Sequence, residues 1–156
     1  MAAADYGGRA GDGGDDREAN CKNMLAIRPS EYPSREAQQR LAARLNLAWD
    51  ESMQYWPCEV ADSARLEEFV DTFAVETLQE GERFLLMELV VESANMQEDL
   101  GALHEDTWAR ISGELLTHQH LYRNIIRYWS VWGTRREDAF CISPRMRRIW
   151  RRLDRK

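Results

Sequence analysis

Residues 84–91, with the sequence FLLMELVV, constrain the fold of this chain more than any other stretch. Only Glu88 interrupts an otherwise apolar run, and such a run has to lie at the centre of a folded domain. Periodicity alone does not separate a buried strand from a buried helix in so short a run. The apolar pattern continues to Met96, Leu, Met and Glu favour helix, and no partner strand is visible nearby. The sequence therefore predicts a central helix over about 82–97.

Helical periodicity recurs before this central stretch. A first helix is expected at 35–48, with a continuation to Trp56, where Pro57 stops it. Either Asp62 or Ser63 is expected to cap a second helix, and Gly81 is its natural end.

Three more helices are expected after the central one. The first is capped by Asp106 or Thr107, and the second spans about 119–132. After a short extended segment at 140–142, the third opens at the N-cap Ser143, followed by a proline at its N1 position. The second of the three is expected to place its aromatic residues in the core, namely Tyr128, Trp129 and Trp132. The predicted fold class is all-α, a single-domain bundle of five or six short helices around the central apolar helix.

The first 23 residues differ in composition from the rest of the chain. They are rich in Gly, Ala and Asp and contain almost no apolar side chain to bury, so burial cannot offset the entropy lost on ordering. We expect a disordered tail at 1–23. The remaining residues, 24–156, are expected to form one helical domain, which is usual for a chain of 156 residues.

Charge is distributed very unevenly along the chain, although the net charge is only −6. Residues 50–106 carry sixteen acidic residues against two arginines, a net charge of −14. Residues 145–156 carry seven basic residues and one Asp, a net charge of +6. A strongly acidic segment attracts a positively charged surface and repels nucleic acid. We expect an acidic face formed by Glu67, Glu68, Asp71, Glu76, Glu88 and Glu92.

The leading functional hypothesis is a non-enzymatic protein-interaction module, such as an inhibitor, an immunity-type protein or an adaptor. It would present the acidic face to a basic macromolecular partner, which we expect to be another protein. The competing interpretation is that the acidity serves solubility and pairs internally with the Arg-rich C-terminal helix. Glu88 and Glu92, four residues apart, are expected to form the solvated stripe of the central helix or to face arginines.

The basic C-terminus supports an alternative function as a nucleic-acid-associated protein. Its possible contacts are Arg147, Arg148, Arg151 and Arg152, with Trp150 as a stacking surface. The other 144 residues carry a net charge of −12, which disfavours binding of a polyanion. The apolar positions of this helix instead predict docking on the core, with its arginines reaching acidic neighbours. Binding of a basic amphipathic helix to a membrane surface is a further interpretation.

A small helical enzyme with a His/carboxylate site is the remaining alternative. His104, His118 and His120 are the candidate bases, and Glu114 lies one helical turn before His118. Their spacing matches no zinc motif such as H-E-x-x-H, and no glycine-rich phosphate-binding motif occurs. We therefore expect no catalytic residue, metal site or cofactor, while the oligomeric state stays open.

Cysteine usage and hydropathy bear on the compartment. Cys21, Cys58 and Cys141 are far apart and odd in number, which argues against a disulfide framework. The chain has no run of about 18–20 apolar residues, so we expect no membrane span. It also begins without the hydrophobic core of a signal peptide. These features predict a cytoplasmic protein.

Overall fold

The computed structural model describes residues 32–155, apart from the side chain of Arg136. The tail predicted at 1–23 lies outside these residues. The α-helices are α2 (Arg35–Leu45), α3 (Trp56–Glu59), α4 (Leu66–Thr72), α5 (Glu80–Asp99), α6 (Glu105–Thr117), α7 (Gln119–Ser130) and α8 (Ser143–Leu153). Two 3₁₀ turns lie at Ser63–Arg65 and Arg136–Asp138, and residues 32–155 contain no strand. The predicted all-α class is confirmed.

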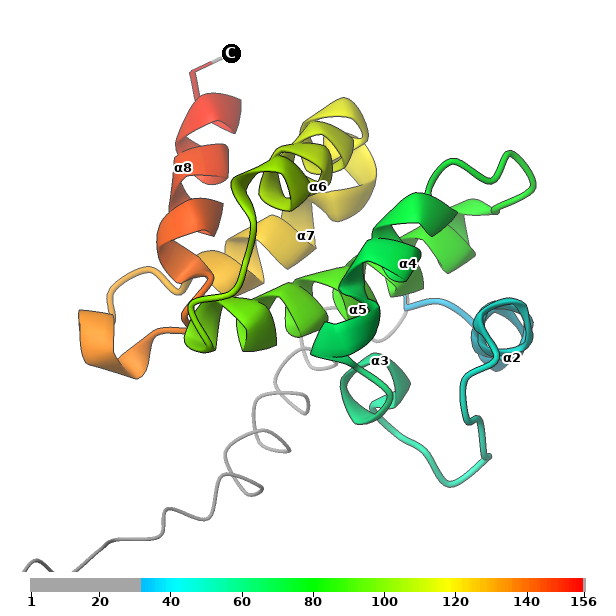
Figure 1. The fold of residues 1–156 in the computed structure, drawn as a ribbon. Coiled ribbons are helices and arrows are strands. Elements are labelled where there is room, and N and C mark those ends of the chain that lie inside the picture. Colours follow the sequence, from blue (N-terminus) through cyan, green and yellow to red (C-terminus); the bar gives the residue numbers. More distant parts are fainter. Residues whose placement is uncertain (1–31, 156) are drawn as a thin grey trace, which may run out of the picture.

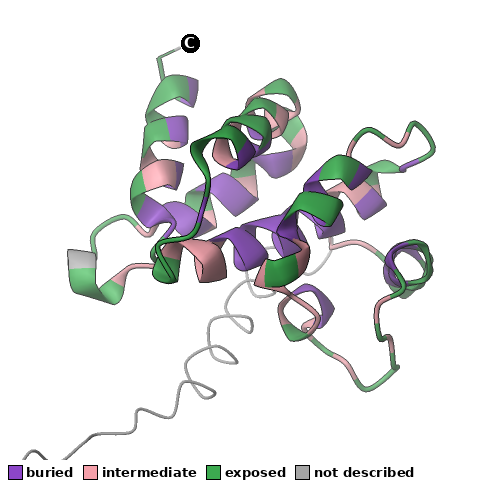
Figure 2. Cartoon of the chain, in the orientation of Figure 1, coloured by how far each residue is buried: buried purple, intermediate pink, exposed green. Residues whose placement is uncertain are grey.

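Helix α5 runs through the middle of the molecule, as predicted for the central apolar stretch (Figure 1). Every residue from 85 to 94 is buried, including the polar ones (Figure 2). Helices α2, α3, α4 and α7 all pack against α5. Because these neighbours enclose it, α5 has no solvent-facing stripe over this stretch.

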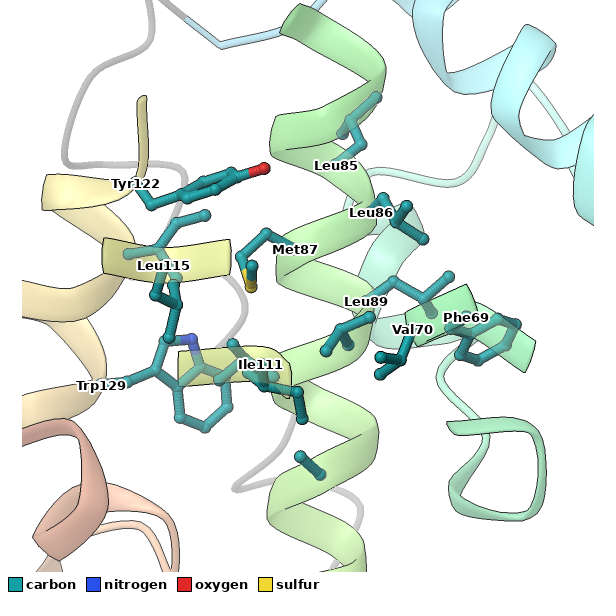
Figure 3. Close-up of a cluster of buried hydrophobic side chains, with 14 of the residues drawn as sticks. Phe69, Val70, Leu85, Leu86, Met87, Leu89, Ile111, Leu115, Tyr122 and Trp129 are labelled. Carbon is teal, nitrogen blue, oxygen red and sulfur yellow. The ribbon is translucent and has the colours of Figure 1, made fainter. Parts of the chain in front are cut away.

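Side chains from several helices meet on α5 in the core (Figure 3). Phe69 and Val70 of α4 lie on one side of α5, and Leu115 and Tyr122, from α6 and α7, lie on the other. All four are buried. Helix α5 therefore supplies a common core for the described helices that precede it and for those that follow it in the sequence.

The start of α5 differs from the prediction. The helix begins at Glu80, where Gln79 and Glu82 form a capping box, with the Gln79 N–H donating to Glu82 Oε2 at 3.0 Å. Gly81 was predicted to end the preceding helix, but it lies in the first turn of α5. That prediction is wrong because α4 already ends at Thr72 and a loop separates the two helices.

The first helix is also shorter than predicted. Helix α2 ends at Leu45, and Asn46 adopts the left-handed conformation (φ 51°, ψ 49°) typical of a helix C-terminus. Asn tolerates this conformation better than most residues. Trp56 begins the separate short helix α3 and is buried, with its Nε1 donating to the carbonyl of Ala48 at 2.7 Å.

Residues 140–142 form a turn, not the predicted extended segment. Helix α8 starts at Ser143, whose Oγ donates to the Trp129 carbonyl at 2.7 Å and does not cap the helix. The backbone N–H of Ile142 donates to Asn95 Oδ1 of α5 at 3.0 Å. The buried apolar residues of α8 are Met146, Ile149 and Leu153. Since α8 packs against α7 and α6, the helix is docked on the core, as expected.

The C-terminal end of α7 exposes an aromatic residue that was predicted to be in the core. Trp129 is buried and Tyr128 is half-buried, but Trp132 is 48% exposed. Helix α7 ends at Ser130, and Val131 takes a left-handed conformation (φ 43°). The chain therefore changes direction before Trp132, which no longer lies on the inward face. The buried residues of α7 that the pattern missed are Tyr122, Ile126 and Ser130.

The cysteines do not behave as expected. Cys58 is disulfide-bonded, which the argument against a disulfide framework did not anticipate for this residue. Cys141 is a free, exposed thiol that lies 3.3 Å from Asp99 Oδ1. Partial burial and this hydrogen bond raise the pKa of the Cys141 thiol. The cytoplasmic location stays a prediction that cysteine usage no longer supports.

No helix within residues 32–155 combines the length and the apolar character needed to cross a bilayer.

Candidate interaction surfaces

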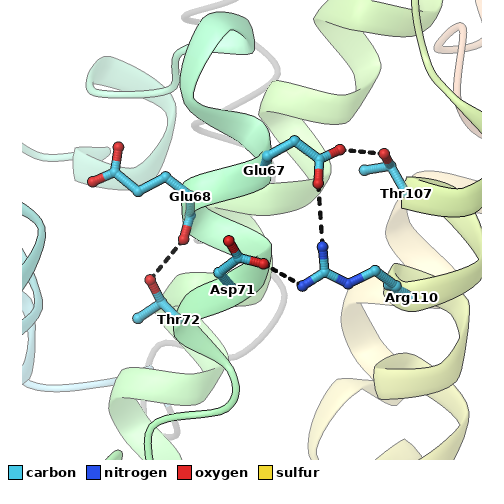
Figure 4. Close-up of polar contacts among 6 residues, drawn as sticks. All are labelled: Glu67, Glu68, Asp71, Thr72, Thr107 and Arg110. Atoms are coloured by element: carbon cyan, nitrogen blue, oxygen red, sulfur yellow. Dashed lines mark hydrogen bonds and ion pairs between the residues drawn. The ribbon is translucent and has the colours of Figure 1, made fainter.

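Helix α4 presents three carboxylates on its outer side, which we call the α4 acidic face: Glu67, Glu68 and Asp71 (Figure 4). Their side chains are 61%, 52% and 68% exposed, respectively. The opposite side of the helix buries Phe69 and Val70 in the core. The core therefore fixes the direction in which the carboxylates project.

Arginines of the same chain already contact the α4 acidic face. Arg110 of α6 pairs with Glu67 at 3.2 Å and with Asp71, and Thr107 Oγ1 donates to Glu67 (Figure 4). These contacts join α4 to α6 across the surface. Because the groups are exposed, each pair contributes little to stability, about 0.2–1 kcal/mol.

Glu68 has its own partner. Arg65 donates to its two carboxylate oxygens at 2.8 and 2.6 Å, a bidentate arrangement, and these bonds lower the pKa of Glu68. The internal pairing expected by the competing interpretation thus occurs at this face, but with Arg65 and Arg110 and not with α8. Glu76 is exposed in the loop after α4.

Glu88 and Glu92 do not belong to the surface, contrary to the expectation of a solvated stripe. Their relative exposures are 3% and 7%, because neighbouring helices enclose α5. The Tyr32 hydroxyl donates to Glu88 Oε2 at 2.8 Å. Burial raises the pKa of Glu88 to about 8, and the hydrogen bond from Tyr32 offsets only part of that rise. Burial also raises the pKa of Tyr128, with Glu92 and Glu88 adding to the shift.

Two arginines of the C-terminal segment, Arg145 and Arg147, form contacts that hold α8 against the rest of the fold. Arg145 donates to Glu98 at 3.1 Å and to Glu105 at 3.1 and 2.7 Å, so α8 does reach acidic neighbours in the −14 segment. These bonds, chiefly to Glu105, raise the pKa of Arg145. Arg147 donates to the carbonyls of Ser130 and Val131 at 2.7 and 2.6 Å, where α7 ends. Arg147 therefore links α7 to α8. Its guanidinium is engaged within the fold, whereas the sequence predicted it as a contact for nucleic acid.

The other predicted basic contacts remain on the surface. Arg148, Arg151 and Arg152 are exposed, and none of them forms an ion pair with another described residue. The guanidiniums of Arg147 and Arg151 lie 5.5 and 5.7 Å from the ring centre of the exposed Trp132. Sequence reasoning missed Trp132 as a surface residue, since helical spacing alone did not reveal where α7 ends.

Glu114 of α6 gathers polar groups from three helices. Its Oε1 accepts from Arg83 at 3.2 Å and from the Tyr122 hydroxyl at 3.0 Å. His118 Nδ1 lies 3.0 Å from the same oxygen but without the geometry of a hydrogen bond to any described residue. His104 stands at the other end of α6, about 20 Å away at 1.5 Å per residue. The structure thus joins His118 to a carboxylate but separates it from His104.

Removal of the Glu114 carboxylate is expected to destabilise the folded protein. Glu114→Ala is expected to lower the free energy of unfolding by about 1–3 kcal/mol, because it leaves the Tyr122 hydroxyl without its acceptor and Arg83 without its carboxylate partner. Urea denaturation followed by circular dichroism measures the change. Glu105→Ala is the matched control, since Glu105 is 79% exposed where it meets Arg145, and it should destabilise the protein clearly less than Glu114→Ala does. Equal losses in the two variants would contradict the structural role of Glu114.

Metal-ligand side chains do not converge in the described part of the chain. Among residues 32–155 no group of three or more His, Cys, Asp or Glu side chains is arranged to hold a metal ion. No family model, curated protein or solved structure matches the chain.

Proposed function

We propose that this chain is a non-enzymatic protein-interaction module, of inhibitor, immunity-type or adaptor kind, that presents the α4 acidic face and Glu76 to a basic surface of a partner protein. The observation that carries the proposal is the arrangement of Glu67 and Asp71 around the guanidinium of Arg110. Two carboxylates held one helical turn apart are suitably spaced for a single guanidinium. An arginine of a partner can occupy the same place.

Rigid presentation supports this proposal. The buried side chains of α4 hold the helix against α5, so the carboxylates are ordered before a partner binds. The exposed carboxylates of the α4 acidic face, together with the exposed Glu76, attract a basic partner to the surface around α4. Glu88 and Glu92 have no part in the proposed surface, since both are buried.

The test uses isosteric neutralisation, because reversal to Lys would also break the internal bonds to Arg110 and Arg65. A triple variant, Glu67→Gln, Glu68→Gln and Asp71→Asn, keeps oxygen acceptors for the internal hydrogen bonds but removes three charges. The immobilised wild-type chain is expected to retain a basic protein from a soluble extract at low salt and to lose it as salt rises. The triple variant should weaken binding by about 1 kcal/mol or more, since exposed pairs contribute about 0.2–1 kcal/mol each.

A control with the same change in net charge, and a variant expected to bind more tightly, separate the role of the α4 acidic face from that of the overall charge. The control neutralises three exposed carboxylates away from α4, with the substitutions Glu51→Gln, Glu80→Gln and Glu137→Gln. It changes the net charge equally and should retain the same protein. Arg110→Gln should strengthen binding, because it frees Glu67 and Asp71 for the partner. Retention of the same protein by the triple variant, or weaker binding by Arg110→Gln, would contradict the proposal.

A further inference from the structure

A second surface lies outside the proposed acidic interface. It consists of the outward side of α8 and the adjacent turn, and we call it the α8 basic surface: Trp132, Arg148, Arg151, Arg152 and Arg155. All five side chains are exposed. The apolar side of α8 is already buried against α7, so the exposed side is not needed to complete the core.

Trp132 is held in place although it is half exposed. The Arg147 guanidinium lies 5.5 Å from the centre of its ring, and its bonds to the carbonyls of Ser130 and Val131 fix that guanidinium. Arg151 approaches the same ring at 5.7 Å. A large aromatic ring that is held in position and still 48% exposed can stack with a flat ligand, which would displace the Arg151 guanidinium from the ring.

The charges on this surface are only partly compensated among the described residues, where Arg148 interacts electrostatically with Glu105. None of the four arginines of the α8 basic surface pairs with a carboxylate in residues 32–155. Arg148 and Arg152, and likewise Arg151 and Arg155, are like charges four residues apart on or just beyond a helix, an arrangement that destabilises it. The helix dipole favours Arg151 and Arg152, which lie in the last turn of α8, but not Arg148. An anionic ligand would relieve this repulsion.

We propose that the α8 basic surface binds single-stranded nucleic acid, with a base stacked on Trp132 and phosphates contacting Arg148, Arg151 and Arg152. Each nucleotide carries both a flat ring and a phosphate, which match the ring and the guanidiniums side by side on this surface. An acidic peptide supplies the charge but no ring with each charge. Membrane insertion does not fit, because the apolar side of α8 is buried in the core.

The acidity of the remaining chain limits this contact. Residues outside 145–156 carry a net charge of −12, but charges beyond about 8–10 Å are screened at physiological salt. Near the end of α8 the carboxylate of Asp154 faces Arg123 at 3.6 Å, and that guanidinium lies 4.9 Å from the ring centre of Trp150. The contact is therefore expected to involve a few nucleotides at this edge and not a long wrapped strand.

Fluorescence anisotropy with a labelled oligothymidylate tests the proposal at a series of salt concentrations. With about three phosphate contacts, the logarithm of the affinity should fall with the logarithm of salt at a slope of about −2. Trp132→Ala should weaken binding roughly 5- to 150-fold through loss of stacking, and Trp132→Phe should restore part of it. The double variant Arg148→Gln/Arg152→Gln should weaken binding and make the slope shallower by about 1.4.

The control is a double variant on α2, Arg35→Gln/Arg44→Gln, which removes two exposed arginines and changes the net charge equally. It should leave the slope unchanged. No binding at low salt, or equal losses in the two double variants, overturns the proposal. Tighter binding of an oligoglutamate of equal charge, or an unaltered Trp132→Ala variant, also overturns it and points to an acidic protein as the ligand.

Discussion

A Glu88→Gln variant is expected to become more stable than the wild type as pH rises, with the difference growing between about pH 4.5 and pH 8. Glu88 is buried in α5, and burial raises its pKa from 4.5 to about 8, with the hydrogen bond from Tyr32 opposing the rise. In this interval the native state keeps the Glu88 proton while the unfolded state has lost it. Stability from this group is therefore fully present below about pH 4.5 and is lost as pH rises towards 8.

The size of the effect follows from the linkage relation. A difference of one bound proton changes the free energy of unfolding by up to about 1.4 kcal/mol per pH unit. The glutamine side chain introduced by Glu88→Gln carries no proton to lose, so the variant should lack this part of the pH dependence while keeping an oxygen acceptor for Tyr32. Urea denaturation at several pH values measures both slopes.

Two further variants make the pH experiment decisive. Glu76→Gln is the matched control, since Glu76 is exposed and its surroundings change little on unfolding. Its stability should run parallel to the wild type across the interval. Tyr32→Phe removes the hydrogen bond that lowers the Glu88 pKa, so its pH dependence should extend to higher pH. Parallel curves for Glu88→Gln and the wild type would show that Glu88 is ionised in the folded protein.

Truncation of the central helix is expected to have the second large effect. Leu89 is fully buried on α5 and lies near Val70 of α4 (Figure 3). Leu89→Ala should lower the free energy of unfolding by about 2–5 kcal/mol through lost burial and an unfilled cavity. Domains of this size are stable by only about 5–15 kcal/mol, so the melting temperature should fall by about 2–4 °C per kcal/mol.

The same substitution at the end of α5 provides the control. Leu100 caps the helix but is 73% exposed, so Leu100→Ala should change the stability by less than about 0.5 kcal/mol. Thermal unfolding followed by circular dichroism compares the two variants. A small effect at Leu89, similar to that at Leu100, would contradict the central position of α5 in the core.

The helix boundaries that sequence reasoning missed have local causes. Gly81 was predicted to be a helix end because glycine is common there, yet the capping box of Gln79 and Glu82 starts α5 just before it. The left-handed conformation of Val131 ends α7 early, and a β-branched residue gives no sequence signal for such a turn. Trp132 was misplaced for the same reason.

Sequence patterns identify some residues of the candidate surfaces, and only the structure identifies their partners. The carboxylates of α4 follow from helical periodicity, because Leu66, Phe69 and Val70 define the buried side and leave the acidic residues outside. Their partner Arg110 lies about forty residues away in sequence and on another helix, so no local pattern identifies it. The role of Arg147 as an anchor likewise depends on where α7 ends.

The sequence by itself determined that residues 84–91 form the centre of an all-helical protein, because an apolar run of good helix formers has to be enclosed. It also determined where charge accumulates along the chain. Only the tertiary structure decided which charged groups reach water. Glu88 and Glu92 look like a polar stripe in sequence, but the helices around α5 leave that stripe no solvent side. Burial depends on all neighbours of a helix at once, and its own periodicity does not record them.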